Sequence, residues 1–191
     1  MTDYIPTRKI RRLEQFAEEL AENLDELKNR VDESRILTDE FAFLFEKCLR
    51  GVAENYQTVK LDSFRNILVN SAIGINLSGN EKEYFLNLVT TLSVLHIQIL
   101  KFMAHPVQYL EMNGILAEQI RGGFSDFFPV AIPGTDLDVI KSAFGELHQY
   151  GFINTDKTIF STMTSGQGLD LLGNRVSNLG RKFIEFCSRP S

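Results

Sequence analysis

The sequence predicts a mainly α-helical protein in two parts, a helical N-terminal part over residues 1–80 and a second domain with a small β-hairpin over residues 81–191. Three observations lead to this prediction. Apolar residues recur at helical spacing through most of the chain, polar and Gly-containing clusters separate these runs, and two short β-like runs lie within residues 152–161. With 43% hydrophobic and 24% charged residues in 191, the chain has the composition of an ordinary globular protein.

The first predicted element is a long amphipathic helix with a heptad repeat. Its apolar positions step alternately by three and four residues, with mostly charged residues between them: Ile10, Leu13, Ala17, Leu20, Leu24, Leu27 and Val31. This spacing is typical of a helix that packs along a seam, either on its own domain or against another helix in a coiled coil. The second interpretation predicts a dimer or other homo-oligomer, or a complex with another helical protein. The basic residues within 8–12 are interpreted as a solvated helix start.

Two further helices are predicted in the N-terminal part. Thr38 is followed by two acidic residues, and a hydroxyl cap with negative charge beside it favours a helix start. The next apolar run begins at Leu61 and stops at Gly74. Residues 76–80, NLSGN, form a polar turn cluster that is the first strong break in the chain. The boundary between the two parts is therefore predicted there.

The second part begins with helical runs and a predicted loop. Ser93 is the predicted cap of one helix, and Pro106 is expected to interrupt or bend it. A weaker helix is predicted over residues 107–121. The segment FSDFFPVAIPGT, residues 124–135, is predicted to be a loop because it contains two prolines and has a glycine near its end. Its three phenylalanines are expected either to lie under the core or to form an exposed docking patch.

The remaining elements are a helix, a hairpin and a closing helix. Thr135 is the predicted cap of a helix that ends at Gly151. The following residues predict a hairpin, with a strand at 152–153, a turn at 154–157 and a returning strand at 158–161. A short strand at residues 175–176 and a helix opened by the next serine complete the chain.

This order of elements resembles a winged-helix module. "LSVLHIQILKFM" is similar to the first helix of that family, "DVIKSAFGELHQYGFI" to its third helix and first wing strand, and "RVSNLGRKFIEFC" to the strand and helix after the wing. The resemblance covers roughly residues 88–188. The whole chain also resembles uncharacterised bacterial proteins of the abortive-infection alpha type, through "EKEYFLNLVTTLSVLHIQILKFM" and "VSNLGRKFIEFC". That second resemblance implies a bacterial protein with a possible link to phage defence.

DNA binding is the alternative function that the winged-helix resemblance implies. The residues that could contact DNA are Lys141, His148, Lys157 and Arg175. The helix over residues 135–150, however, offers one lysine against three acids, which opposes its approach to a polyanion. The formal charge of the whole chain is −5, which is also unlike a typical nucleic-acid binder. DNA is therefore a possible but not a favoured partner.

The sequence contains no recognisable catalytic, cofactor-binding or metal-ligating pattern. None of the three histidines has a Cys or acidic partner at ligand spacing, and Cys48 and Cys187 lie far apart in the chain. "SGQGLDLLG", residues 165–173, lacks the spacing of a phosphate loop and is interpreted as a flexible wing. No segment has the pattern of a signal peptide or a membrane span, which predicts a cytoplasmic protein. The leading hypothesis is a non-catalytic protein without a cofactor that self-associates through its N-terminal helix.

Overall fold

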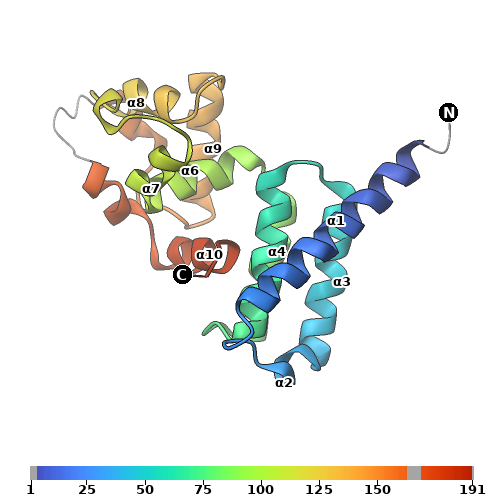
Figure 1. The fold of residues 1–191 in the computed structure, drawn as a ribbon. Helices are drawn as coiled ribbons and strands as arrows, with labels where there is room; N and C mark the ends of the chain where they lie inside the picture. The colour runs from blue at the N-terminus through green and yellow to red at the C-terminus, as the bar shows by residue number, and fades with distance from the viewer. Residues whose placement is uncertain (1–3, 163–168, 191) are drawn as a thin grey trace. The chain divides into compact units, whose positions relative to one another are not determined.

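The computed structural model describes residues 4–162 and 169–190, and this part of the chain is mainly helical (Figure 1). The prediction of a mainly α protein is thus confirmed. The chain divides into two compact units. Unit 1 consists of residues 1–92 together with 185–191, and unit 2 consists of residues 93–184. We predicted a boundary after residue 80, whereas the units divide after Leu92 and again after Ile184. None of the described helices is long and apolar enough to cross a membrane.

Unit 1 is a helical bundle. It contains α1 (Tyr4–Glu26), α2 (Glu33–Ile36), α3 (Asp39–Glu54), α4 (Thr58–Ile73) and α5 (Gly79–Thr91). Helices α3 and α4 pack against each other at its centre; α3 also packs against α1 and α5, and α4 also contacts α1, α2 and α5. Phe64 and Phe85 are fully buried in its core. The predicted start of α3 is confirmed, because Thr38 Oγ1 accepts a 3.2 Å hydrogen bond from the N–H of Phe41. The predicted stop at Gly74 is confirmed by its left-handed φ of 82°.

The predicted heptad helix is shorter than its apolar pattern. Helix α1 ends at Glu26, so Leu27 and Val31 lie beyond it in the turn that leads to α2. The chain is anchored after this turn, where the N–H of Asp32 donates to the carbonyl of Ala72 at 3.0 Å. The Asp32 side chain also caps α2. The bond to Ala72 and the cap both require the chain to turn away from the axis of α1 before Asp32. The expectation of one uninterrupted helix through residue 31 is therefore wrong.

Two asparagines of α4 hold the end of the last helix, α10 (Asn178–Cys187). Asn70 Nδ2 donates to the carbonyl oxygens of Phe186 at 2.9 Å and Ser188 at 2.8 Å. Asn66 Nδ2 donates to the carbonyl oxygen of Cys187 at 3.1 Å. The last carbonyl groups of a helix have no partner within the helix, so these side chains supply the missing donors. This is how residues 185–190 become part of unit 1.

Unit 2 is built around a cluster of phenylalanine rings. Phe128 is fully buried, and its ring centroid lies 5.2 to 5.8 Å from those of five others, Phe102, Phe124, Phe127, Phe144 and Phe160. The α-helices of the unit are α6 (Val94–Ala104), α7 (Pro106–Met112), α8 (Phe124–Ala131), α9 (Leu137–Gln149) and the first part of α10. The 3₁₀ turns are η1 (Ala117–Gln119), η2 (Lys157–Ser161), η3 (Leu169–Leu171) and η4 (Gly173–Arg175). Pro106 separates α6 from α7, as expected.

The segment predicted to be a loop contains a helix. Helix α8 occupies Phe124–Ala131 even though Pro129 lies inside it. The N–H of Gly123 donates to Asp126 Oδ2 at 2.8 Å, and Phe124, Phe127 and Phe128 are all buried. Burial of these three rings outweighs the backbone hydrogen bond that a proline cannot donate. The phenylalanines therefore belong to the core and form no exposed docking patch.

The predicted β-hairpin is also wrong. Ile153 forms an isolated antiparallel bridge with Val176, and the expected returning strand is the 3₁₀ turn η2. Asp156 caps this turn by accepting a 2.9 Å hydrogen bond from the N–H of Thr158, and the turn carries Phe160 into the phenylalanine cluster. Among the described residues no regular strand occurs, so the hairpin expected from the winged-helix resemblance is not supported. Of the expected wing, residues 165–173, residues 165–168 lie outside the described residues, and the described residues 169–173 contain η3 and the start of η4.

Candidate functional site

Helix α1 carries the predicted association seam and packs against α3 and α4 within unit 1. Phe16 and Leu20 face inward, with exposed fractions of 3% and 6%. Ile10 is 55% exposed, and Ala17 is also exposed. The other seam residues, Leu13, Leu24, Leu27 and Val31, are half-buried. The seam thus divides between an inward edge used by unit 1 and an outward edge in contact with solvent.

The first turns of α1 reach past the rest of unit 1. Arg12 Nη2 donates to the carbonyl oxygen of Ala53 at 3.1 Å, near the end of α3. Farther along, Arg65 of α4 makes ion pairs with Glu19 and Asp62. Figure 1 shows the N-terminal turns of α1 extending beyond the other helices of this unit. Ile10 lies two residues before Arg12 and is more than half exposed.

Charge is distributed unevenly along α1. The basic residues of the helix come first and the acidic residues follow them: Arg8, Lys9, Arg11 and Arg12, then Glu14, Glu18, Glu19, Glu22, Asp25 and Glu26. Most of these side chains are exposed. Two such helices placed antiparallel would bring opposite charges together, whereas parallel helices would align like charges.

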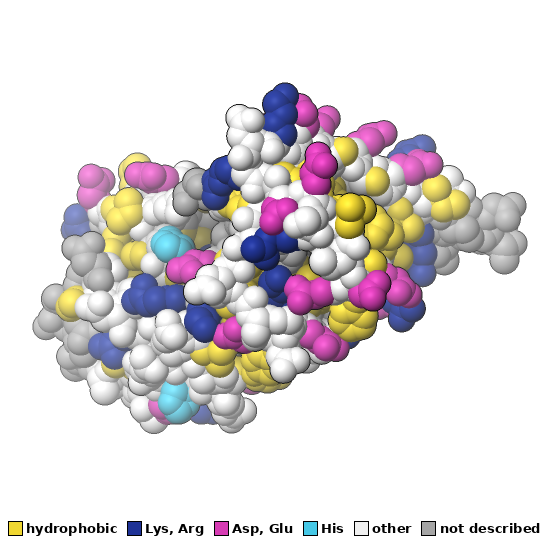
Figure 2. Space-filling view, turned by 90° about the horizontal axis from the view of Figure 1, so that it is seen from below, with side chains coloured by type: hydrophobic (Ala, Val, Ile, Leu, Met, Phe, Trp, Pro, Cys, Tyr) yellow, Lys and Arg dark blue, Asp and Glu magenta, His cyan; other side chains and the backbone are white. Residues whose placement is uncertain are grey.

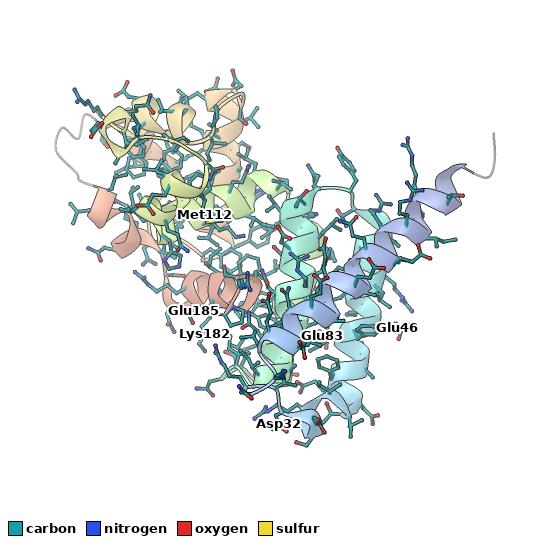
Figure 3. All side chains as sticks on the ribbon, in the orientation of Figure 1. Asp32, Glu46, Glu83, Met112, Lys182 and Glu185 are labelled. Carbon is teal, nitrogen blue, oxygen red and sulfur yellow. The ribbon has the colours of Figure 1, made fainter. Side chains whose placement is uncertain are left out.

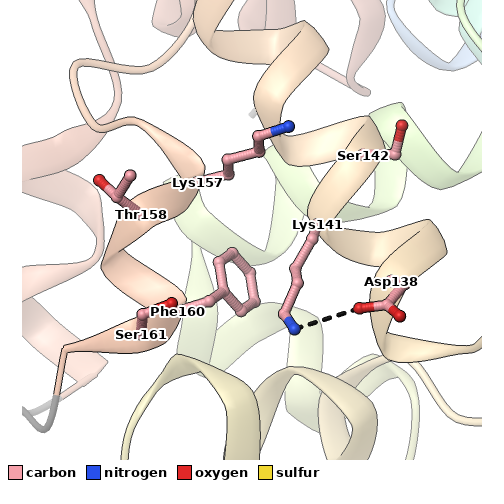
Figure 4. Close-up of a pocket in the computed structure, with 7 residues that line it drawn as sticks. All are labelled: Asp138, Lys141, Ser142, Lys157, Thr158, Phe160 and Ser161. Carbon is pink, nitrogen blue, oxygen red and sulfur yellow. Dashed lines mark hydrogen bonds and ion pairs between the residues drawn. The ribbon is translucent and has the colours of Figure 1, made fainter.

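Two of the four residues considered for DNA contact line one pocket in unit 2. The pocket lies between α9 and η2 and has a volume of about 360 Å³ (Figure 4). It is lined by Asp138, Lys141, Ser142, Lys157, Thr158, Phe160 and Ser161. His148 and Arg175 are not among these lining residues. His148 Nδ1 lies 3.9 Å from Asp156 Oδ2, and Arg175 Nη1 donates to Thr155 Oγ1 at 3.0 Å.

The positive charge of this pocket is partly neutralised. Lys141 Nζ forms a 3.2 Å ion pair with Asp138 Oδ1. Lys157 is exposed, and its aliphatic chain passes close to Gly145 of α9. Figure 4 shows the two lysine side chains extending in different directions. The pocket therefore supplies amino and hydroxyl donors around a buried Phe160, with a small net positive charge.

A hydrogen-bonded chain of three polar side chains connects α6 and α9. Ser93 Oγ lies 2.7 Å from His96 Nδ1, and His96 Nε2 lies 3.0 Å from Glu146 Oε2. His96 is only 8% exposed, whereas Ser93 is exposed and the Glu146 side chain is about half-exposed at 49%. The imidazole is thus held from both sides, with an exposed serine residue at one end.

The hydrogen bonds assign the proton on the His96 ring. The backbone N–H of Ser93 donates to Nδ1 at 3.2 Å, so this nitrogen accepts and Nε2 carries the proton. Nε2–H then donates to the Glu146 carboxylate, and Nδ1 can also accept the Ser93 hydroxyl proton. This arrangement is not visible in the sequence, because Glu146 lies 50 residues beyond His96 and only the packing of α6 on α9 brings them together.

The remaining candidates for chemistry do not form a comparable site. Cys48 and Cys187 are both buried, and burial raises the pKa of the Cys48 thiol, which disfavours a reactive thiolate. Within residues 4–162 and 169–190, no group of three or more His, Cys, Asp or Glu side chains could hold a metal ion. The expectation that the protein uses no metal or cofactor stays a prediction.

No protein-family model, curated protein or solved structure matches this chain. The resemblance to abortive-infection alpha proteins, with its implied bacterial origin and role in phage defence, therefore stays a prediction.

Proposed function

We propose that the protein is an interaction protein that self-associates through α1, with two copies pairing antiparallel. The observation that carries this proposal is the exposure of Ile10, a large apolar side chain in the first half of α1. An exposed apolar side chain on an otherwise amphipathic helix gains free energy when a partner covers it.

The outward residues of α1 have the spacing of a helix–helix interface. Ile10, Ala17 and Leu24 recur every seven residues and therefore lie along one stripe of the helix. In an antiparallel pair centred on Ala17, Ile10 of each copy meets Leu24 of the other. The small Ala17 side chains at the centre allow the two helices to approach closely. The same surface serves both copies, as in a two-fold symmetric dimer.

The charges on α1 favour this partner and this direction. With Ala17 at the centre, residues 8–12 of one copy lie near residues 22–26 of the other. The first range carries the basic residues of the helix and the second carries Glu22, Asp25 and Glu26. Opposite charges across an interface fix its orientation and exclude the parallel arrangement, in which like charges would meet.

The test is the oligomeric state of the full chain, measured by sedimentation velocity over a range of concentrations. We expect a dimer whose dissociation constant rises at least tenfold in Ile10→Asp, because a buried carboxylate would replace an apolar contact. Val139→Asp is the matched control, since Val139 is 52% exposed but lies on α9 of unit 2. A wild-type protein that is monomeric at every concentration would exclude the proposal, and so would an equal effect of both substitutions.

A second candidate is binding of nucleic-acid phosphates, which we propose because Lys141 and Lys157 line the same pocket. The neighbouring hydroxyl groups of Ser142, Thr158 and Ser161 could donate hydrogen bonds to phosphate oxygens. Against it, acidic and basic side chains are interspersed over the face shown in Figure 2. A polyanion generally needs a larger basic surface.

This second candidate is tested by fluorescence anisotropy with mixed-sequence duplex DNA from low to moderate salt. We expect affinity to fall with salt, and Lys141→Glu and Lys157→Glu to weaken binding at low salt. Arg121→Glu provides the control, because Arg121 is an exposed cation outside the pocket. If DNA does not bind even at low salt, this candidate is excluded while self-association is unaffected.

A further inference from the structure

The Ser93–His96–Glu146 chain has the arrangement of a nucleophile, a base and an orienting acid. The hydroxyl lies 2.7 Å from one imidazole nitrogen, and the carboxylate lies 3.0 Å from the other. These distances lie within the range needed for proton transfer and for fixing the imidazole tautomer. Such constellations are recognised by geometry and roles, since they recur on unrelated folds.

We propose that Ser93 is a nucleophile for acyl transfer from small carboxylic esters, with His96 as its general base and Glu146 as a positioning residue. This activity goes beyond the proposed self-association and does not depend on it, because all three residues lie in unit 2. It also departs from the sequence-based expectation of a non-catalytic protein.

A second serine in the same kind of position shows what is unusual about Ser93. Ser78 is the exposed residue that precedes α5, and its Oγ accepts a hydrogen bond from the N–H of Glu81 at 3.3 Å. This is ordinary capping, and the side chain three residues on is an acid. Ser93 precedes α6 in the same way and contacts the side chain three residues on, as Ser78 contacts Glu81, but here that side chain is the imidazole of His96, which can take up a proton.

The position of Ser93 also places its oxygen near groups that stabilise negative charge. The first N–H groups of α6 have no carbonyl acceptor within the helix. A helix N-terminus carries partial positive charge, which favours an oxyanion formed beside it. This contribution supports the three-residue arrangement and would not define a site alone.

The reaction can be written with these groups alone and water. Ser93 Oγ forms a bond to the ester carbonyl carbon while its proton moves to His96 Nδ1, and the carbonyl electron pair moves onto oxygen. When this intermediate collapses, the bond to the alcohol breaks and the leaving oxygen takes the proton from Nδ1. Water then attacks the acyl-serine carbonyl, with Nδ1 taking its proton and returning one to Ser93. The products are a carboxylic acid and an alcohol.

The exposure of Ser93 indicates which esters would react. Ser93 is an exposed residue, so a small ester with unhindered access to the carbonyl fits best. An aryl ester is the suitable probe because its leaving oxygen requires little help from a proton donor. During the reaction Glu146 would stabilise the imidazolium that forms, since Nε2–H remains bonded to its carboxylate.

The first experiment treats the full chain with a fluorophosphonate probe, which forms a stable bond to activated serines, and locates the label by peptide mass spectrometry. We expect labelling of Ser93 and not of Ser78, and a burst of nitrophenol from 4-nitrophenyl acetate. His96→Gln should lower both rates by about 10² or more. Glutamine can still accept the N–H of Ser93, as Glu81 does for Ser78, so the helix start is preserved. Circular dichroism confirms folding of the variant.

The second experiment separates positioning by Glu146 from a structural role. The ¹⁵N chemical shift of His96 Nε2 should change in Glu146→Ala, because its N–H loses the carboxylate acceptor while the Ser93 N–H still fixes the tautomer, and Ser93 should be labelled more slowly. Glu146→Gln should restore the chemical shift and the labelling rate, because its amide oxygen can accept from Nε2–H.

The proposal is overturned if Ser93 is labelled no faster than Ser78, or if His96→Gln leaves labelling unchanged. The role of Glu146 is also overturned if Glu146→Ala changes neither the ¹⁵N chemical shift of His96 Nε2 nor the labelling rate. None of these results bears on the dimer, which is measured by sedimentation.

Discussion

At the scale of single residues, buried and capping polar groups hold segments that are distant in sequence. Asn70 is 3% exposed and donates to the carbonyl oxygens of Phe186 and Ser188, which are more than a hundred residues away. Asp156 caps η2 and so determines where Phe160 enters the core. Each of these residues therefore has an effect that can be measured separately.

Replacing Asn70 with Leu should destabilise unit 1. The substitution removes the amide donor and leaves carbonyl groups at the end of α10 without it, at an expected cost of ~1–3 kcal/mol. The loss should appear as a lower urea midpoint for unfolding. Asn76→Leu is the control, because Asn76 is exposed and the change there should be small. Equal midpoints for the two variants would contradict the role of Asn70.

Asp156 should stabilise unit 2 in a pH-dependent way. The backbone N–H of Thr158 bonds to its carboxylate and is the main cause that lowers its pKa below the usual 3.8. Because the folded pKa is the lower one, the stabilisation is fully present above the unfolded value and is lost as the pH falls through the folded value. The melting temperature of Asp156→Ala should therefore lie below that of the wild type at pH 7. The difference should shrink below about pH 4, and a pH-independent difference would refute this explanation.

At the scale of elements, each helix divides its surface between its own unit and solvent. In α1, Phe16 and Leu20 pack inward while Ile10 and Ala17 remain outside. In α9, Ile140 and Phe144 are buried, whereas Lys141 and Ser142 line the pocket next to η2. Periodicity identifies apolar faces but does not say which edge of a face the chain itself will cover.

The proposed antiparallel pairing of α1 predicts a charge-swap effect. The double variant Lys9→Glu, Arg11→Glu should dimerise more weakly than the wild type, because acidic residues would then meet acidic residues. A second variant, Glu22→Lys with Asp25→Lys, should also be weak alone, but a mixture of the two should form a heterodimer. Native mass spectrometry of the mixture is the measurement. Absence of the heterodimer while wild-type dimers persist would exclude the antiparallel arrangement, and the effect should decrease with salt.

At the scale of the whole molecule, the chain builds unit 1 from both of its ends. Residues 185–191 belong to the same unit as residues 1–92, and α10 begins in one unit and ends in the other. Glu185, labelled in Figure 3, is the first residue of the returning segment. Unit 1 is therefore incomplete without the last residues of the chain.

Truncation of the C-terminus should show this dependence. A chain that ends after Ile184 loses the acceptors of Asn66 and Asn70 and the buried Phe186, and should have a lower melting temperature. A chain that ends after Ser188 keeps these groups and is the matched control. If the two truncated proteins melt at the same temperature, the segment contributes little to unit 1.

Much of the helical fold was predictable, and the failures have identifiable causes. The Thr38 start and the Gly74 stop depend on local backbone chemistry that is visible in the sequence. The loop predicted around Pro129 and the hairpin predicted at residues 152–161 were wrong because burial of Phe128 and Phe160 overrode local preference. Of the site residues, the meeting of Lys141 and Lys157 followed from neither spacing nor charge.

The sequence by itself determined that the protein is helical, where several helices begin and end, and that α1 carries a heptad pattern with basic residues followed by acidic ones. These are local properties, because capping, periodicity and charge act within a few residues. Only the tertiary structure decided which seam residues unit 1 covers, that residues 185–190 return to unit 1, and that His96 meets Glu146. The physical reason is that these outcomes depend on burial and hydrogen bonding between groups far apart in the chain. A single sequence does not show which of these distant groups come into contact.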